Sequence, residues 1–367
     1  MLGYCSYELG EQLRLKNKPV NSAKNTQLNT FPSLFIGHYT WSYVFDHRNS
    51  QGYLTFSPLC SLMTRKTVLD AIKASANKQF EREPNTEADR DNEERHLSTL
   101  SWTKSQTISE YKSQFDQIEN FINCGDCYQA NLTQRFEAKS YINAADLYFT
   151  SREKIQTPYS SFISFNDSQS LLSFSPEQFI SIKGRVIESK PIKGTIINNG
   201  NADNISALQD SKKNRAENVM IVDLIRNDLG RVCKPNSIHV PELFKVETYK
   251  NVHHLVSHVK GTLKDGISNL EAFISCFPGG SITGAPKIRS MQIINQLEKH
   301  ARSAYCGSVF YLNQSGDFDS NILIRTVVKD AEQLYCWAGG GIVADSEFMD
   351  EYQESLTKVA NITGIET

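Results

Sequence analysis

Short runs in which apolar and polar residues alternate recur along this chain, and single stretches with helical spacing separate them. Strand-like runs cover 129–137, 161–165, 171–174, 179–182, 308–312, 318–328 and 334–343. Helical spacing covers 107–124, 214–229, 286–297 and a stretch that begins near Phe348. Long strand runs with helices set between them favour an α+β fold over a doubly wound parallel sheet.

The polarity of the sequence changes twice along the chain. Residues 1–73 contain short strand-like runs broken by Gly, Pro and Asn. Residues 74–106 are polar and densely charged, so we expect a mobile linker there. The regular pattern resumes at Thr107 and continues to about 364, which predicts one large catalytic domain. At 367 residues the length allows two domains or one large one.

Composition excludes several classes of protein. The net charge is −2, from 39 basic and 41 acidic residues, and the absence of a Lys/Arg-rich stripe argues against a nucleic-acid partner. The first residues lack a basic segment followed by a long apolar run, and no stretch of about 18 apolar residues occurs, so we expect no membrane segment. The 8 scattered cysteines favour reduced thiols and a cytoplasmic protein.

Carboxylates occur at helical positions where a cation is expected. Glu217 has Met220, Ile221 and Leu224 on its own helix face, so its carboxylate needs a partner. A salt bridge to an Arg such as Arg215 explains it, and so does a metal ion. Near the C-terminus, three side chains share one helix face: Glu351, Glu354 and Lys358. Mg²⁺ prefers one or two protein carboxylates together with water and substrate oxygens.

Two glycine clusters and one lysine are further candidates. Gly279–Gly284 leads into a helix, and Gly339–Gly341 interrupts a strand run, so each cluster is either a tight turn or a place where backbone amides approach an anion. Lys193 lies between Ile192 and Gly194 at the end of an apolar alternation. A lysine removed from water is a candidate nucleophile, and a lysine in water is only a surface charge.

Several segments, taken in this order, resemble the chorismate-utilising enzymes, the family that contains the anthranilate, isochorismate, salicylate and aminodeoxychorismate synthases. The resemblance runs from about Thr107 to Gly364. It rests on SPEQF, PIKGT, RAENVMIVDLIRNDLGRV, HHLVSHVKG, FPGGSITGAPKIRSMQII, AYCGSVFY, NILIRT, GGGIVADS and EYQES. It implies two large, mainly antiparallel sheets packed together and flanked by helices.

Two positions within the resemblance point to amination of chorismate by ammonia. The residue before Gly-Thr is Lys193 here, as in the members that aminate ring carbon 4, whereas the other members carry Ala. Gln129 stands where the water-activating members carry a basic lysine. The implied products are 4-amino-4-deoxychorismate and then 4-aminobenzoate, a precursor of folate. No glutaminase motif is present in the sequence, so the resemblance implies a glutamine amidotransferase subunit as ammonia source.

The resemblance also implies roles for individual residues. Mg²⁺ is held by Glu217 and Glu354, with Glu351 acting through water, and it binds the ring carboxylate of chorismate. Lys193 attacks ring carbon 2, and Glu177 is the general acid for the 4-hydroxyl. The remaining substrate-binding residues are Arg325, Tyr305, Lys358, Thr195, His254, Gln129 and the backbone at Thr283, Gly284, Gly340 and Gly341.

Members of the family have roughly a hundred further residues before the segment matched by LGYCSYELG near the start of this sequence. The part at 1–73 is therefore expected to be a partial N-terminal region. Two other functions remain open: an anthranilate synthase, which aminates ring carbon 2, and an inactive relative that serves as a scaffold for a glutaminase subunit.

Overall fold

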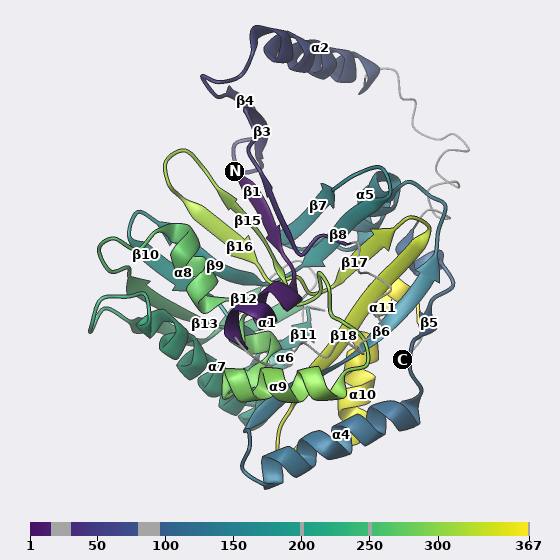
Figure 1. Cartoon of the computed structure of the whole chain (residues 1–367), viewed down its shortest axis with the longest axis vertical. Helices are drawn as coiled ribbons and strands as arrows, with labels where there is room; N and C mark the ends of the chain where they lie inside the picture. Colours follow the sequence, from purple (N-terminus) through teal and green to yellow (C-terminus); the bar gives the residue numbers. More distant parts are fainter. Residues whose placement is uncertain (16–30, 80–95, 199–201, 249–251, 366–367) are drawn as a thin grey trace.

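A computed structural model of the protein describes residues 1–15, 31–79, 96–198, 202–248 and 252–365. Two large sheets dominate it, and every pair of neighbouring strands within them is antiparallel. Helices cover the outer faces of the sheets (Figure 1). The architecture confirms the predicted α+β fold.

The first sheet has nine strands. In spatial order they are β11 (Ile192–Ile197), β13 (Val252–Thr262), β10 (Val186–Ser189), β9 (Gln178–Lys183), β16 (Phe318–Asn321), β15 (Ser308–Leu312), β1 (Leu2–Cys5) and β2 (Leu34–Gly37), with β12 (His239–Thr248) also paired to β13. Because β1 pairs with β15, the first residues of the chain belong to the same sheet as strands far along the sequence.

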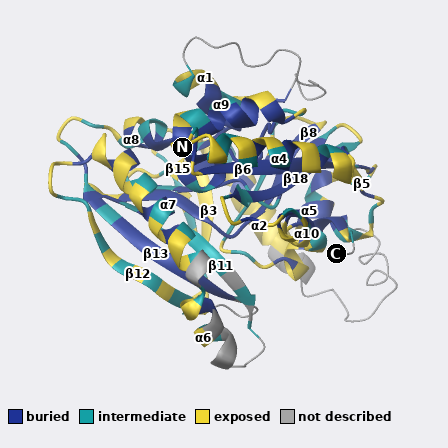
Figure 2. Cartoon of the chain, turned by 90° about the horizontal axis from the view of Figure 1, so that it is seen from below, coloured by how far each residue is buried: buried dark blue, intermediate teal, exposed yellow. Residues whose placement is uncertain are grey.

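The second sheet has seven strands. In spatial order they are β14 (Gly284–Ala285), β6 (Gln129–Lys139), β18 (Gln333–Ile342), β17 (Thr326–Asp330), β8 (Gln169–Ser175) and β7 (Tyr159–Ser164), with β5 (Thr103–Lys104) also paired to β6. β6 and β18 are its longest pair, and both are mostly buried, as Figure 2 shows.

One hydrophobic cluster joins the two sheets, because it contains Leu171 and Trp337 from the second sheet together with Ile182 and Phe318 from the first. Another cluster lies between the second sheet and its helices. The larger helices are α1 (Tyr7–Arg14), α2 (Leu62–Gln79), α4 (Ile108–Asn123), α5 (Ala144–Lys154), α6 (Ala202–Asp210), α7 (Lys212–Gly230), α8 (Asn269–Cys276), α9 (Lys287–Leu297) and α10 (Phe348–Thr357); shorter ones are α11 (Ala360–Thr363), η1 (Leu97–Thr99) and η2 (Gly280–Ile282). No helix in the described part of the chain is long and apolar enough to cross a membrane.

Helix α4 shows how the sequence determines one of these elements. Tyr111, Phe115 and Ile118 recur at helical spacing and are all buried against the second sheet. Thr107 and Glu110 form a reciprocal capping box, which satisfies backbone N–H groups at the start of the helix. The prediction of a helix ending near Cys124 is confirmed.

One predicted strand and the expected linker differ from the structure. The run at 318–328 is two strands, β16 and β17, which lie in different sheets, and the chain crosses between them at Ile322–Arg325. In the expected linker at 74–106, α2 continues to Gln79 and Leu97 is fully buried, while residues 80–95 lie outside the described part. Strands β3 (Trp41–Asp46) and β4 (Gln51–Phe56) pair with each other and, with α2, project from the body (Figure 1).

A buried ion pair in the segment after α9 holds that segment against the second sheet. The guanidinium of Arg302 donates to both carboxylate oxygens of Glu298, at 2.9 and 2.7 Å, and both side chains are almost completely buried. Arg302 also donates to the carbonyl oxygens of Ile282 and Asn131. Glu298 accepts hydrogen bonds from the backbone N–H and hydroxyl of Thr133.

Replacing Arg302 with Met should therefore lower the free energy of unfolding by about 3 to 5 kcal/mol, because the carboxylate of Glu298 remains buried without its cation. Urea-induced unfolding of the two proteins measures the difference. Lys112→Met is the control, since Lys112 pairs with Asp116 at the same i,i+4 spacing but in solvent; its effect should stay below about 0.5 kcal/mol. Equal losses in the two variants would contradict the role given to burial.

Candidate active site

A cavity of about 550 Å³ opens between the two sheets, with α7 and α10 beside it. Eleven of the side chains and glycines predicted from the sequence line it: Glu177, Lys193, Glu217, His254, Tyr305, Arg325, Gly340, Gly341, Glu351, Glu354 and Lys358. These residues come from at least five separate elements and connections. The fold therefore assembles in one place most of the residues that the sequence suggested separately.

Two lysine–carboxylate pairs lie in the wall of this cavity. The ammonium nitrogen of Lys193 on β11 lies 3.5 Å from a carboxylate oxygen of Glu217 on α7, and both side chains are largely buried. Lys358, directly after α10, lies 2.6 Å from Glu354 and donates to the carbonyl oxygen of Gly339. The partner of Glu217 is thus Lys193, whereas the sequence interpretation offered an Arg; Arg215 instead stacks on Phe244.

Gly340 brings the backbone of β18 close to the charged groups of α10. A Cβ atom added at Gly340 would lie 3.0 Å from Glu351 Oε2, 3.7 Å from Lys358 Nζ and 3.8 Å from Glu354 Oε1. The hydroxyl of Ser346 donates to the other oxygen of Glu351 at 2.8 Å. The glycine therefore leaves room for two carboxylates and a lysine at one point on the cavity wall.

Three carboxylates around the cavity could act as ligands of a hard divalent cation. Within the described residues, no three carboxylate, histidine or cysteine side chains already form a cluster tight enough to hold a metal ion. Glu217, Glu351 and Glu354 nevertheless line the same cavity, from helices on different sides of it. Such a donor set suits Mg²⁺, which takes few protein ligands and completes its shell with water and substrate oxygens.

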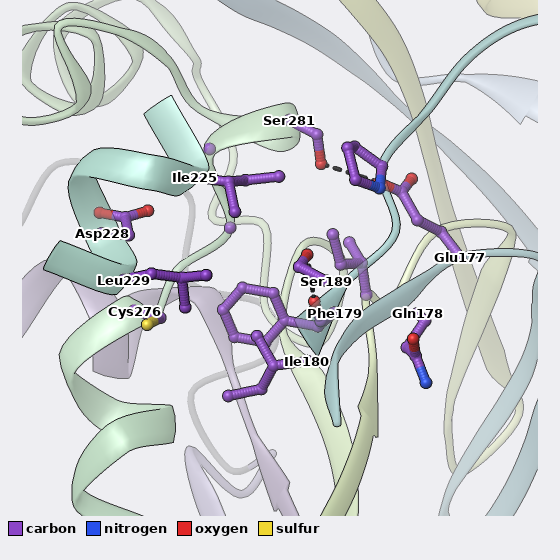
Figure 3. A pocket seen from close by; sticks show the side chains of 14 residues that line it. Glu177, Gln178, Phe179, Ile180, Ser189, Ile225, Asp228, Leu229, Cys276 and Ser281 are labelled. Atoms are coloured by element: carbon purple, nitrogen blue, oxygen red, sulfur yellow. Dashed lines mark hydrogen bonds between the residues drawn. The ribbon is translucent and has the colours of Figure 1, made fainter. Parts of the chain in front are cut away.

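Glu177 lies at the boundary between this cavity and a smaller one of about 20 Å³. The hydroxyl of Ser281 donates to Glu177 Oε1 at 3.0 Å, and Figure 3 shows this contact from the side of the small cavity. Burial raises the pKa of Glu177 to about 7, while the positive charge of Lys193 and the Ser281 hydrogen bond act in the opposite direction. Near neutral pH, Glu177 is therefore suited to give up or take a proton.

Arg325 provides a buried positive charge on another side of the cavity. It lies at the end of the crossing between the two sheets, and its backbone has φ +51°. Burial lowers the pKa of Arg325, and burial together with the Arg325 charge lowers the pKa of His254 to about 4. His254 is therefore neutral at pH 7. Tyr305 stacks on Trp337 with ring centroids 6.3 Å apart.

Among the predicted site residues with described side chains, Gln129, Thr283 and Gly284 do not line the cavity. Gln129 is completely buried behind Gly341, where an added Cβ would lie 1.7 Å from its amide nitrogen. The backbone N–H of Thr283 donates to Gly280, and Gly284 belongs to β14 paired with β6, so the amides expected to face an anion are used inside the protein. Thr195 pairs through its backbone with His254, and its side chain lies outside the described part.

Besides apolar residues and further glycines, the cavity is lined by four polar residues that were missed: Asn131, Asn214, Ser281 and Thr357. Asn131 lies two residues after Gln129 on β6, and Asn214 lies three residues before Glu217 on α7, so strand and helix periodicity place each on the face of a predicted residue. That periodicity was a usable signal. Ser281 belongs to the first glycine cluster, but nothing in the sequence pairs it with Glu177.

The fold and the cavity define an enzyme that acts on a small anionic molecule, with an acid, a lysine and paired carboxylates around the ligand space. Comparison with known proteins then gives the family. The sequence profile described as "chorismate binding enzyme" matches residues 1–364. The chain belongs to the family of chorismate-binding enzymes.

Similar proteins include two curated relatives, both named aminodeoxychorismate synthase component 1. The protein from Salmonella typhimurium is 40% identical over 365 residues, which cover 98% of this chain and 75% of the relative. The protein from Escherichia coli is 37% identical over 366 residues, with 98% and 75% covered. Among solved structures, anthranilate synthase component I from Streptococcus pneumoniae superimposes with a TM-score of 0.81 at 28% identity, covering 98% of this chain and 79% of that one.

The low pKa of His254 leads to a testable expectation. The pKa of His254 is about 4 in the folded protein, against about 6.5 for a free histidine. Between pH 6.5 and pH 4, the unfolded chain therefore binds a proton at this residue that the folded protein does not bind. His254 therefore costs stability as the pH falls from about 6.5 towards 4, and has no such effect above 6.5. NMR titration of the imidazole, assigned with His254→Asn, should show the neutral form down to about pH 5.

Arg325→Gln tests whether the positive charge of Arg325 contributes to the low pKa of His254. Removing that positive charge should raise the pKa of His254, although burial keeps it below 6.5. An imidazole in the unmodified protein that titrates near 6.5 would contradict the described burial and charge.

Proposed function

We propose that this enzyme joins ammonia to chorismate and forms 4-amino-4-deoxychorismate, the precursor of 4-aminobenzoate in folate biosynthesis. The observation that carries the proposal is the meeting of Lys193 and Glu177 in one cavity, beside Glu217. The names of the curated relatives described above support the same reaction. The positive charge of Lys193 lowers the pKa of Glu177, which also supports their closeness.

The reaction divides into two displacements. The amine nitrogen of Lys193 attacks ring carbon 2, the ring double bond shifts, and the bond from ring carbon 4 to its hydroxyl breaks. Glu177 donates its proton to that hydroxyl, so that water leaves. Ammonia then attacks ring carbon 4, the double bond shifts back, the amine of Lys193 departs, and the added nitrogen gives one proton back to Glu177. Lys193 is restored, and water has been exchanged for ammonia.

Charged groups on the cavity wall hold the two carboxylates of chorismate. Arg325 and Lys358, with the backbone at Gly340 and Gly341, face the enolpyruvyl carboxylate, and Tyr305 and neutral His254 complete the wall. Glu217, Glu351 and Glu354 would hold Mg²⁺. When bound, the ion offsets the carboxylate charge that pairs with Lys193 and binds the ring carboxylate.

Ammonia comes from a glutamine amidotransferase subunit. The designation "component 1" in the names of the relatives supports a second component. We place the enzyme in the cytoplasm, which suits its eight free cysteines.

Product analysis tests the proposal most directly. Chorismate, ammonium and Mg²⁺ should yield a product that a lyase converts to 4-aminobenzoate. Anthranilate, which is fluorescent, would instead mark amination at ring carbon 2. Isochorismate as main product would contradict amination altogether, and an absence of any chorismate turnover would favour the scaffold alternative.

Glu217→Gln should lower turnover by orders of magnitude and weaken Mg²⁺ binding in a calorimetric titration, because it removes a charged ligand from the site. Asp223→Asn is the matched control: Asp223 lies on the same helix, α7, but its side chain is 78% exposed. This control should behave like the unmodified enzyme. Full turnover of Glu217→Gln in a chelating buffer would remove the metal from the mechanism.

If Lys193 is a nucleophile, chorismate and Mg²⁺ without ammonia should leave part of the protein heavier by the mass of chorismate minus water. Lys193→Ala should abolish this adduct and slow amination strongly, because a methyl group cannot attack. Intact-protein mass spectrometry measures the adduct. Lys190→Ala, three residues earlier and outside the cavity lining, is the control and should keep it.

The competing role for Lys193 is that of a positive charge which only steadies the substrate. In that case no adduct forms, and Lys193→Arg keeps appreciable activity. An unmodified mass of the enzyme, under conditions where chorismate is demonstrably bound, would decide for this role.

A further inference from the structure

Glu177 has one described hydrogen-bond donor for its carboxylate, and that donor is Ser281. Ser281 Oγ lies 3.0 Å from Glu177 Oε1, and both residues line the large cavity as well as the small one behind it. In Figure 3 the two side chains point toward each other across the boundary of the small cavity. Glu177 itself is only 7% exposed, so solvent offers little competition for this contact.

The loop that carries Ser281 is anchored on one side by a buried cation. The ammonium group of Lys287 donates to the carbonyl oxygens of Cys276 and Pro278, at 2.9 and 2.7 Å. It also forms an ion pair at 2.5 Å with Asp228 on α7, and both side chains are about 95% buried. Breaking such a pair is costly, so the start of the loop is held firmly against α7.

A second buried cation anchors the other end of the loop. Arg302 donates to the carbonyl oxygen of Ile282 at 2.9 Å. The hydroxyl of Thr283 closes the turn by donating to Gly279 O at 2.9 Å. The side-chain amide of Asn131 donates to the carbonyl oxygen of Ser281 itself, at 3.3 Å. Ser281 therefore lies between two anchored ends and has little freedom to move away from Glu177.

We propose that Ser281 is a positioning residue for Glu177: its hydroxyl occupies Oε1, so that the proton needed for catalysis is carried by Oε2. This inference rests on the proposed role of Glu177 as general acid. A carboxylic acid has two oxygens that can carry its proton. Because a donated hydrogen bond makes Oε1 the acceptor, the proton is localised on the other oxygen, which no described donor occupies.

Loss of the Ser281 hydroxyl also changes the acidity of Glu177. The hydrogen bond stabilises the charged carboxylate, so its removal should raise the pKa of Glu177 above about 7. Lys193 and Lys358 act on Glu177 in the same direction and remain in the variant. The other charged or titratable groups that line the two cavities are Glu217, His254, Tyr305, Arg325, Glu351, Glu354, Asp228 and Cys276.

The test measures the ionisation of Glu177 directly, without turnover. The side-chain carbon of Glu177 in ¹³C-glutamate-labelled protein is assigned with Glu177→Gln and titrated by NMR. In Ser281→Ala the midpoint should move upward by about one pH unit. Ser281→Thr keeps a hydroxyl and should restore the original midpoint. Ser189→Ala is the matched control: Ser189 lines the same small cavity, but its hydroxyl donates to Phe179 O.

Kinetics supply a second readout. In Ser281→Ala, kcat should fall roughly tenfold with KM nearly unchanged, because the acid is misoriented while substrate contacts persist. The alkaline limb of the kcat profile should move to higher pH together with the NMR midpoint.

An unchanged midpoint in Ser281→Ala, or an equal shift in Ser189→Ala, would overturn the proposal. The failure of the proposed reaction is a separate result. If the unmodified protein turned over no chorismate while the NMR shift appeared as expected, the pairing of Ser281 with Glu177 would stand and only the reaction would be wrong.

Discussion

The close approach of β6 and β18 is the constraint on which the site depends. A Cβ added at Gly339 would lie 1.9 Å from the carbonyl oxygen of Leu132, so no other residue fits there without separating the strands. Gly340 then faces Glu351 and Glu354 of α10 together with Lys358, and Gly341 faces the buried side-chain amide of Gln129. Three consecutive glycines thus allow one strand to pair tightly, to border the cavity and to leave space for side chains from two other elements.

Local patterns predicted the elements better than their connections. Helix α4 was predictable because Tyr111, Phe115 and a capping box act within sixteen residues of each other. The run at 318–328 looked like one strand because Ile322–Ile324 continues its apolar character. The pairing partners decide that the chain leaves one sheet and enters the other there, and one partner of each strand, β9 for β16 and β8 for β17, lies more than a hundred residues away. Periodicity within a segment carries no such information.

The same distinction applies to the site. A carboxylate on an apolar helix face calls for a cation, for which the sequence offered an Arg or a metal ion; the fold places Lys193 next to Glu217. The resemblance to chorismate-utilising enzymes identified eleven of the residues that line the cavity, including its charged side chains. It did not reveal that Thr283 and Gly284 use their backbone groups internally, or that Ser281 contacts Glu177. Those contacts depend on how a loop is folded, which neither spacing nor residue type specifies.

The crossing at Ile322–Arg325 couples ligand binding to the stability of the fold. The cavity lies where the chain passes from one sheet to the other, and its walls include Lys193 from the first sheet and Gly340 from the second. A ligand that contacts both acts as a further noncovalent cross-link between two layers that already share one hydrophobic cluster. Ligand binding at the site therefore raises the free energy of unfolding of the whole fold, by an amount that grows with the logarithm of the free ligand concentration once this exceeds Kd.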